Sequence, residues 1–412
     1  MRLVAVCLAC LVAVSAAARA AENWPQFRGP TGDGMSTVTG LPVTWSEQEH
    51  VVWKTPIHGK AWSSPVIWDN QIWMTSATEN GKQRYAVCVD RDSGKVLHDL
   101  LLYAIPEPQF CHQFNSYASC TPVIEEGRVY VHFGSAGTAC LDTSTGKVLW
   151  SREDLECDHF RGAASSPILF GNLLVVALDG YDYQYVVALD KETGKTVWRK
   201  DRNIQYDSNE GDIKKGYSTA TIIEVDGKQQ LVYPSAQDTI AYEPLTGDEL
   251  WRVHHGGMNA AARPLFGHGR VYINTAAGGL KLFALKVGGT GDVTKDIEWK
   301  SSQGVSTRSS QLLIGDAIYM VSDAGIATCT DAHTGKAIWQ KRLDGEFSAS
   351  PICAEGRIYY CNQDGQTFVV AARPEYELLA TNRLDDGCMA SPAVYGKAIY
   401  LRTKTNLYRI EN

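Results

Sequence analysis

Hydrophobic residues along the chain fall into short runs in which apolar and polar positions alternate, the pattern of β-strands. Residues 129–133 read Val-Tyr-Val-His-Phe, and residues 317–321 read Ala-Ile-Tyr-Met-Val. Glycine-containing turns separate such runs along the chain. The pattern predicts an all-β protein built from many short strands.

Two phrases recur along the chain. The first consists of small residues, often Ser-Pro, followed by an apolar strand. Its copies begin at residues 64–66, 121–123, 166–168, 219–221, 263–265, 309–311, 350–352 and 391–393. The second joins an Asp to Thr-Gly-Lys and a Trp, with weaker copies among the following: 88–95, 140–150, 188–198, 241–251, 285–299 and 329–339. Copies of the first phrase begin 41 to 57 residues apart, which suits one four-stranded blade each. We therefore expect an eight-bladed β-propeller with four-stranded blades.

Each part of the second phrase has a structural role. Thr-Gly-Lys forms the hairpin between the last two strands, because Gly accepts the left-handed backbone and the Asp accepts turn N–H groups. The Trp then lies on the outermost strand, where it can pack against the next blade and find a partner for its indole N–H. His98 stands at this position in the first copy. The tryptophans that we expect to dock blades are Trp53, Trp150, Trp198, Trp251, Trp299 and Trp339.

The two ends of the chain predict how the ring closes. The last copy, 391–412, holds about three strands and lacks a Thr-Gly-Lys turn. Residues 51–54 precede the first copy and resemble 148–151. We infer that the N-terminal segment supplies the outer strand of blade eight.

Residues 1–20 have the features of a secretory signal: Arg2, an apolar run over 3–18, and Ala-Arg-Ala at 18–20. The expected organisation is a signal peptide over 1–20, an N-terminal arm over 21–50 and the propeller over 51–412. Export to the periplasm or the cell exterior follows. The net charge of −7 becomes −9 without the two arginines of the signal, which argues against a nucleic-acid partner. No later apolar run is long enough for a transmembrane helix.

The repeated Asp, Thr-Gly-Lys and Trp resemble the tryptophan-docking motif of the propellers named after pyrroloquinoline quinone (PQQ). Eight blades with N-terminal closure are similar to quinoprotein alcohol dehydrogenases and to the outer-membrane assembly lipoprotein BamB. The start Trp-Pro-Gln-Phe-Arg-Gly-Pro at 24–30 resembles exported PQQ-like repeat proteins abundant in planctomycetes. A propeller hosts many functions, so this resemblance is specific for fold and not for activity.

The resemblance implies two functions. The leading one is a non-catalytic binding or scaffolding module of the cell envelope, expected to be a monomer without a cofactor or metal, which holds an envelope protein or a carbohydrate. The alternative is an alcohol or sugar dehydrogenase that uses PQQ and calcium. Such enzymes cover the quinone with adjacent cysteines, and this chain has no Cys-Cys pair. A third reading, a role in glycan degradation or sensing, also stays open.

Loops that precede the innermost strands are expected to surround one mouth of the central channel, where propellers usually bind ligands. Lys60 and Trp62 lie on the first of these segments. The candidate ligand-binding residues on the other loops are His112, Asn115, His159, Arg161, Tyr217, His255, Asn259, Arg263, Arg308 and Glu346.

These loops leave several alternatives open. His112, His159 and His255 could face a transition metal, although no tight ligand spacing supports it and separate histidines are favoured. The three arginines could converge on an anion, or they could cap strands and pair with Glu346 and Asp158. An Asp-Gly-Tyr-Asp sequence at 179–182 could hold calcium, but it reads more simply as a hairpin turn.

Nine cysteines follow the signal, so at least one cannot pair within the chain. Cys111 and Cys157 lie at similar distances before their prolines, on neighbouring loops. They form the best candidate disulfide, with two unrelated thiols as the alternative. Cys353 and Cys361, on successive strands, are a second possible pair.

Overall fold

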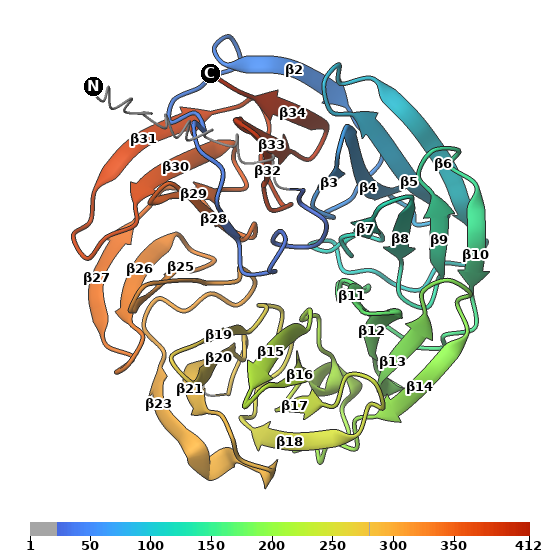
Figure 1. Ribbon diagram of the computed structural model, residues 1–412, viewed down its shortest axis with the longest axis vertical. Helices are drawn as coiled ribbons and strands as arrows, with labels where there is room; N and C mark the ends of the chain where they lie inside the picture. Colours follow the sequence, from blue (N-terminus) through green and yellow to red (C-terminus); the bar gives the residue numbers. More distant parts are fainter. Residues whose placement is uncertain (1–22, 280) are drawn as a thin grey trace, which may run out of the picture.

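The computed structural model describes residues 23–279 and 281–412. The described chain forms a propeller of eight blades around a central axis, as expected (Figure 1). In each blade four strands are antiparallel and follow one another from the axis to the rim. The predicted signal peptide lies outside the described residues. Among the described residues, no helix is long and apolar enough to cross a membrane.

The first four blades run clockwise in Figure 1 from the top of the ring. Blade one comprises β3 (Val66–Trp68), β4 (Gln71–Ala77), β5 (Gln83–Asp90) and β6 (Val96–Ala104). Blade two comprises β7 (Val123–Glu125), β8 (Arg128–His132), β9 (Thr138–Asp142) and β10 (Val148–Arg152). Blade three comprises β11 (Ile168–Phe170), β12 (Leu173–Asp179), β13 (Gln184–Asp190) and β14 (Thr196–Asp201). Blade four comprises β15 (Thr221–Val225), β16 (Lys228–Pro234), β17 (Asp238–Tyr242) and β18 (Glu249–His254), with β22 (Gly291–Asp292) added at its rim.

The other four blades complete the ring. Blade five comprises β19 (Leu265–Gly267), β20 (Arg270–Asn274), β21 (Leu282–Lys286) and β23 (Ile297–Ser301). Blade six comprises β24 (Leu312–Ile314), β25 (Ala317–Val321), β26 (Ile326–Asp331) and β27 (Ala337–Arg342). Blade seven comprises β28 (Ile352–Ala354), β29 (Arg357–Cys361), β30 (Gln366–Ala371) and β31 (Leu378–Arg383), with β1 (Met35–Ser36) beside β28. Blade eight comprises β32 (Ala393–Tyr395), β33 (Ala398–Arg402), β34 (Asn406–Ile410) and β2 (Val51–Pro56). Two short 3₁₀ helices, η1 (Gly211–Lys214) and η2 (Thr294–Asp296), lie in connections.

A β-bulge turns each docking Trp toward the next blade. In blade three the register between β13 and β14 shifts beside Trp198, and Val197 is left without a partner. Val197 is 52% exposed, whereas Trp198 is 7% exposed. The bulge therefore reverses the alternation at this point and buries the indole.

The docking Trp rests on the glycine of the neighbouring turn, which is Thr-Gly-Lys in blade three and Thr-Gly-Asp in blade four. A Cβ placed on Gly194 would lie 2.7 Å from the Trp150 ring, and one on Gly247 would lie 2.6 Å from Trp198. The indole N–H of Trp150 donates to the carbonyl of Lys191 in the same turn, at 2.9 Å. Because only glycine leaves room for the ring, the Trp of one blade and the Gly of the next form one unit.

Blades four and one depart from this arrangement, the former because the next blade lacks the turn and the latter because the Trp itself is replaced. Blade five replaces it with the detour through η2, and Trp251 of blade four bonds Gln230 of its own blade at 2.8 Å instead. His98 of blade one takes the Trp position over Gly146, and stacks on Trp73 with ring centroids 5.6 Å apart.

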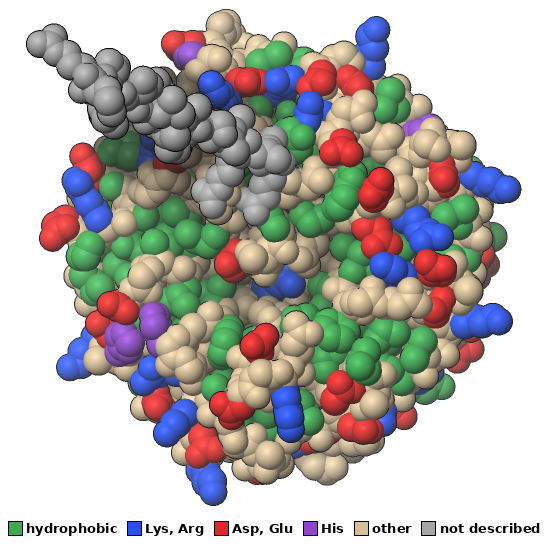
Figure 2. Space-filling view, viewed as in Figure 1, with side chains coloured by type: hydrophobic (Ala, Val, Ile, Leu, Met, Phe, Trp, Pro, Cys, Tyr) green, Lys and Arg blue, Asp and Glu red, His purple; other side chains and the backbone are tan. Residues whose placement is uncertain are grey.

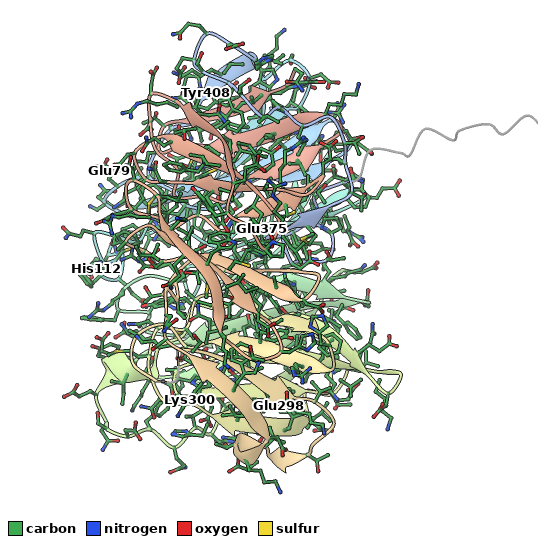
Figure 3. The ribbon with its side chains drawn as sticks, turned by 90° about the vertical axis from the view of Figure 1, so that its left-hand side faces the viewer. Glu79, His112, Glu298, Lys300, Glu375 and Tyr408 are labelled. Carbon is green, nitrogen blue, oxygen red and sulfur yellow. The ribbon has the colours of Figure 1, made fainter. Side chains whose placement is uncertain are left out.

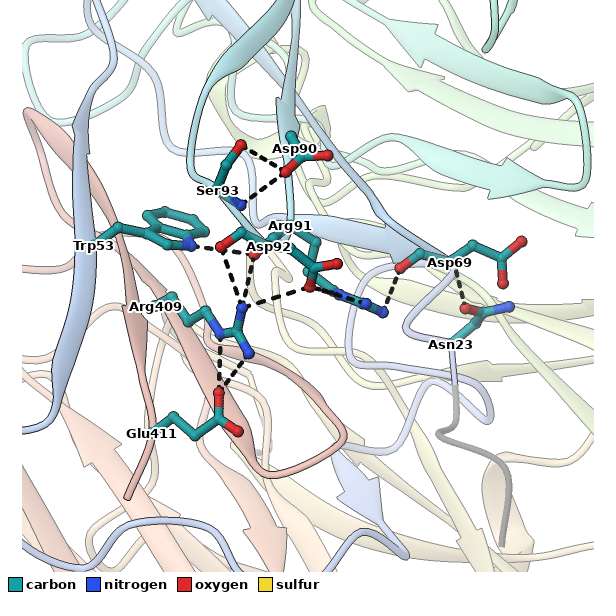
Figure 4. A network of polar contacts seen from close by, with 9 residues as sticks. All are labelled: Asn23, Trp53, Asp69, Asp90, Arg91, Asp92, Ser93, Arg409 and Glu411. Atoms are coloured by element: carbon teal, nitrogen blue, oxygen red, sulfur yellow. Dashed lines mark hydrogen bonds and ion pairs between the residues drawn. The ribbon is translucent and has the colours of Figure 1, made fainter. Parts of the chain in front are cut away.

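The N-terminal strand closes the ring, as the sequence predicted. β2 pairs with β34 from Val51↔Ile410 to Pro56↔Asn406. Trp53 donates its indole N–H to the carbonyl of Arg91 in blade one at 3.1 Å, and Arg409 of β34 bonds the same carbonyl at 3.4 Å (Figure 4). Both chain ends therefore meet the first blade at one seam.

A ring of hydrogen bonds surrounds the channel. The residue before each proline position donates its backbone N–H to the hydroxyl of the equivalent residue in the next blade, at 2.9 to 3.1 Å. Seven of the eight joints have this bond, and the last runs from Ser391 back to Ser64. The exception is the joint of blades four and five, where Arg263 stands in place of the hydroxyl residue. The members in chain order are Ser64, Thr121, Ser166, Thr219, Arg263, Ser310, Ser350 and Ser391.

The arm crosses one end of the channel, in blue near the centre of Figure 1. Trp24 bonds Ile67 of blade one through N–H and carbonyl at 2.9 and 2.8 Å, and Met35 pairs with Cys353 of blade seven. Between them Arg28, which is 1% exposed, donates to the carbonyls of Ser310 and Gln311. Burial lowers the pKa of Arg28 to about 9, so it stays charged at neutral pH.

Arg263 explains the gap in the hydroxyl ring. Its guanidinium turns toward the arm and donates to the carbonyl of Phe27 at 2.8 Å. Gly32 passes so close that a Cβ there would lie 2.1 Å from that guanidinium. The residue that breaks the repeat at the axis is thus the one that fixes the arm.

A glycine pair in blade three tests the Trp–Gly unit. Gly171 and Gly194 both have positive φ, at 55° and 71°, but a Cβ on Gly171 would meet nothing within 4 Å. Gly171→Ala should lower the free energy of unfolding by about 1–2 kcal/mol through backbone strain alone. Gly194→Ala should lower it by about 1–3 kcal/mol more, because the methyl group meets the Trp150 ring. Urea midpoints of the two variants give the comparison, and equal losses would refute the Trp–Gly contact.

Candidate binding site at the channel mouth

A cavity of about 360 Å³ occupies the channel mouth. Its inner wall has one residue from each blade, three positions before the proline position of the repeat. These residues are Trp62, Ser119, Ala164, Tyr217, Ala261, Arg308, Ser348 and Met389. A smaller cavity of about 130 Å³ shares these residues and reaches Phe27 of the arm. The channel is therefore a pocket that the arm closes at its far end.

The upper wall comes from the loops that precede three innermost strands. His112, Phe114 and Asn115 lie on the long loop between β6 and β7, Arg161 between β10 and β11, and Asn259 between β18 and β19. His112 lies on the broad face of the disc at the left of the side view in Figure 3. Asn115 donates to the carbonyl of Arg161 at 2.9 Å, which ties the first two loops together.

Six of the ten residues proposed from the sequence meet at this cavity. They are His112, Asn115, Arg161, Tyr217, Asn259 and Arg308.

Each of the two arginines at the cavity already has one acidic partner. Arg161 pairs with Asp212 of η1 at 2.7 Å, and Arg308 lies 3.5 Å from Asp323. The guanidinium of Arg308 also lies over the Phe114 ring, 3.8 Å from its centre. These acids are not Glu346 and Asp158, the partners considered from the sequence. Both arginines keep donors for a further group at the cavity, because a guanidinium carries five N–H bonds.

Three buried polar atoms around the cavity have no hydrogen-bond partner in the described protein. They are the hydroxyl of Tyr217, the side-chain oxygen of Asn259 and Nε of Arg161. A buried polar group without a partner is unfavourable by about 1–3 kcal/mol, so such groups gather where a ligand or water completes them. The set offers two donors and one acceptor.

The other four proposed residues lie elsewhere. His255 is buried between Thr239, 3.1 Å from its Nε2, and the carbonyl of Gly256, 2.7 Å from its Nδ1. Arg263 holds the arm, and Glu346 is exposed in the loop before β28. His159 lies in a neighbouring pocket with Arg84. The three loop histidines therefore do not converge on a metal, because their loops have different lengths and turn inward by different amounts.

His159 has a structural role. Its Nε2 accepts the backbone N–H of Ser135 at 3.1 Å, which requires that nitrogen to be unprotonated. Burial lowers the pKa of His159 to about 4. The ring is neutral at pH 7.

The proposed disulfides need correction, because every cysteine among the described residues is free. Cys111 approaches the carbonyl of Arg161 at 3.7 Å, while the thiol of Cys157 turns away toward His159 and the carbonyl of Tyr183. The two loops do touch, but the thiols point to different neighbours. Cys361 lies beside the thiol of Cys388 and not beside Cys353.

The Asp-Gly-Tyr-Asp turn is also structural. Asp179 is buried and pairs with Arg202 at 2.6 Å, and Asp182 accepts the backbone N–H of Asp158 at 2.7 Å. Both carboxylates are therefore engaged without calcium.

Sequence reasoning missed Thr307, Ser348 and Met389 at the cavity, and the acids Asp212 and Asp323 behind it. The position three before each proline contained a usable signal, because all eight copies of it face the axis. Asp212 carried none, since it lies on η1, a helix that the equivalent described connections of the other repeats lack.

The donor set does not suit calcium with a quinone. No carboxylate among the described residues lines the cavity, and the nearby Asp212 and Asp323 already pair with arginines. Calcium takes six to eight oxygen ligands, with carboxylates prominent among them. The aromatic and cationic lining suits a bound organic group better than a metal.

Comparison with known proteins identifies the family to which the chain belongs. The family model described as outer membrane protein assembly factor BamB matches residues 47–182 and 182–412. BamB from Yersinia pestis is 23% identical over 252 residues, which are 60% of each chain. A quinoprotein ethanol dehydrogenase from Pseudomonas putida is 29% identical over 141 residues, 31% of this chain and 22% of that enzyme. The chain thus spans less than two thirds of the length of these curated relatives.

Solved structures show the same fold. BamB from Moraxella catarrhalis superimposes with a TM-score of 0.59 at 14% identity, over 87% of this chain and 99% of that one. A quinohemoprotein alcohol dehydrogenase from Comamonas testosteroni superimposes with a TM-score of 0.63 at 12% identity, over 94% and 80%. At these identities the likeness concerns the fold alone.

The neutral state of His159 predicts a pH dependence of stability. The unfolded chain takes up a proton as the pH falls through about 6.5, whereas the folded chain does so only near pH 4. The free energy of unfolding therefore decreases as the pH falls from about 6.5 towards 4. The contribution of His159 to this decrease is about 2 kcal/mol between pH 7 and pH 5. His159→Gln should show a smaller fall in urea midpoint from pH 7 to pH 5 than the unsubstituted protein. An unchanged fall would mean that the imidazole is accessible to protons in the folded state.

Proposed function

Because the chain belongs to the family of the outer membrane protein assembly factor BamB, we propose that it is an exported, non-catalytic binding module of the cell envelope. Its ligand site is the pocket at the channel mouth. The observation that carries this proposal is the set of unpartnered buried polar atoms on Tyr217, Asn259 and Arg161 around an otherwise complete cavity.

The pocket favours a peptide segment with an acidic side chain. Arg161 and Arg308 retain donors for a carboxylate, and the hydroxyl of Tyr217 adds another. Phe114 and Met389 supply apolar contact for a neighbouring side chain. A protein partner agrees with the description of the family as an assembly factor, and an acidic sugar is the competing ligand that the experiment must distinguish.

The quinoprotein relatives favour the second candidate, an alcohol or sugar dehydrogenase with PQQ and calcium. Against it stands the lack of a carboxylate among the described residues that line the cavity.

Calorimetric titration with PQQ separates the two functions. We expect no calcium-dependent binding, so that titrations in calcium and in EDTA are the same. Tight binding that EDTA abolishes would replace the proposed function with the dehydrogenase.

A peptide experiment tests the binding function directly. A library of hexapeptides with a central glutamate should yield a binder, whose glutamine counterpart and a uronic-acid oligosaccharide bind more weakly by calorimetry. Tyr217→Phe should weaken that binder about fivefold, because one hydrogen bond contributes about 1 kcal/mol. Tyr242→Phe is the matched control: its hydroxyl is also buried and unpartnered, but it lies in the core outside the cavity.

Arg308→Gln should remove the preference for glutamate over glutamine, while Arg128→Gln, at a surface ion pair in blade two, should leave it unchanged. Preference for the sugar would assign the pocket to a carbohydrate. Equal binding by Tyr217→Phe and the unsubstituted protein would remove the pocket as the site.

A further inference from the structure

Three side chains with metal-binding groups meet on the opposite face of the disc, at the joint of blades five and six. His268 lies in the turn between β19 and β20, Asp316 in the turn between β24 and β25, and His333 in the turn between β26 and β27. All three are exposed. The rings of His268 and His333 have centroids 4.7 Å apart, and Figure 2 shows histidine colour gathered near the rim of this face, with acidic colour beside it.

The ligand atoms have nearly the spacing of a metal site. Nε2 of His268 lies 3.4 Å and Nε2 of His333 lies 3.1 Å from the same oxygen of Asp316. The three ligand atoms all lie within 4.8 Å of one another. Zinc bonds of about 2.1 Å in a tetrahedral arrangement place neighbouring ligand atoms about 3.4 Å apart. Only the two imidazoles would need to approach each other, and both lie on surface turns.

His268 also has the support that metal-binding histidines commonly have. Its other ring nitrogen, Nδ1, lies 2.9 Å from the hydroxyl of Tyr272. Such a bond fixes the ring and leaves Nε2 for the metal.

The repeats show that the fold does not require histidine at either position. The residues equivalent to His268 in the other blades are Asp69, Glu126, Gly171, Asp226, Gly315, Glu355 and Gly396. His268 has a φ of 55°, a conformation for which two-residue hairpin turns prefer Asn, Asp or Gly. The residues equivalent to His333 in the other turns of its type are Asp92, Ser144, Glu192 and Leu245. Histidine thus occurs once in each set, at two turns that touch.

The corresponding joint of blades two and three gives the competing arrangement. There Glu125 pairs with Lys191 at 2.8 Å and Arg128 pairs with Glu192 at 3.2 Å, so opposite charges join the turns without a metal. At blades five and six a single carboxylate instead faces two imidazoles, which suit zinc, copper and nickel.

We propose that His268, Asp316 and His333 bind a divalent transition metal ion, of which zinc is the representative, and that this ion fastens blade five to blade six. Three protein ligands leave a fourth position for water or for a donor from a partner. The proposal is independent of the pocket at the channel mouth.

Calorimetry with zinc chloride tests the site, on protein without an affinity tag, treated with EDTA and dialysed in the presence of a non-thiol reductant. We expect one equivalent to bind with a Kd of about micromolar or below, and magnesium not to bind. His268→Ala and His333→Ala should each weaken binding at least tenfold. Zinc should also raise the Tm of the unsubstituted protein and not that of either variant.

His58→Ala is the matched control, because His58 is an exposed histidine 2.9 Å from a single carboxylate, Asp99. It should leave zinc binding unchanged. Since all these residues are exposed, the variants are expected to fold, and circular dichroism checks this before titration. Absence of zinc binding, or binding that survives His268→Ala and His333→Ala, would overturn the proposal and leave a histidine–aspartate hydrogen-bonded bridge.

Discussion

A strand that begins with proline has no N–H at its first position, and its inner edge faces a channel with no further strand. The backbone N–H of the residue before the proline must therefore find its acceptor in a neighbouring blade. In this protein it donates to the side-chain hydroxyl of the equivalent residue in the next blade. Seven such bonds hold the innermost strands at a common level around the axis. The residues two positions before these hydrogen-bonding residues then face the axis together, one from each blade, and form the wall of the pocket.

The outer part of the ring depends on a second contact, between an indole and a glycine. The bulge before each Trp turns the ring inward, and the neighbouring Thr-Gly-Lys turn accepts it because the glycine has no Cβ. Where blade five lacks the turn, Trp251 finds its partner within blade four. Where blade seven lacks it, Trp339 packs on Tyr376, with ring centroids 5.2 Å apart. The inner hydroxyl ring and the outer indole contacts together join each blade to the next at two radii.

The sequence was sufficient for the fold because both contacts repeat in it: the blades, their number and the strand that closes the ring follow from the recurring proline and Trp. The site was only partly predictable. Tyr217 and Arg308 occupy a repeated position that faces the axis, whereas Glu346 and His255 lie on loops whose paths no repeat determines. The Cys111–Cys157 pairing failed for a similar reason, since equal offsets place two loops side by side but do not orient their thiols. His268 and His333 lie on turns far apart in the sequence, and only the joint of two blades brings them together.

A ring of eight similar blades offers an N-terminal segment eight nearly equivalent ways to lie across it, differing by one-eighth of a turn. Arg263 removes this degeneracy, because one blade alone carries a guanidinium where the other seven carry a hydroxyl. The arm can satisfy that cation in a single rotational setting, in which Arg28 also meets blade six and Met35 meets blade seven. A break in the repeat at one residue thus gives a pseudo-symmetric ring a defined angular origin, and with it a pocket whose eight walls each have a fixed identity relative to the arm.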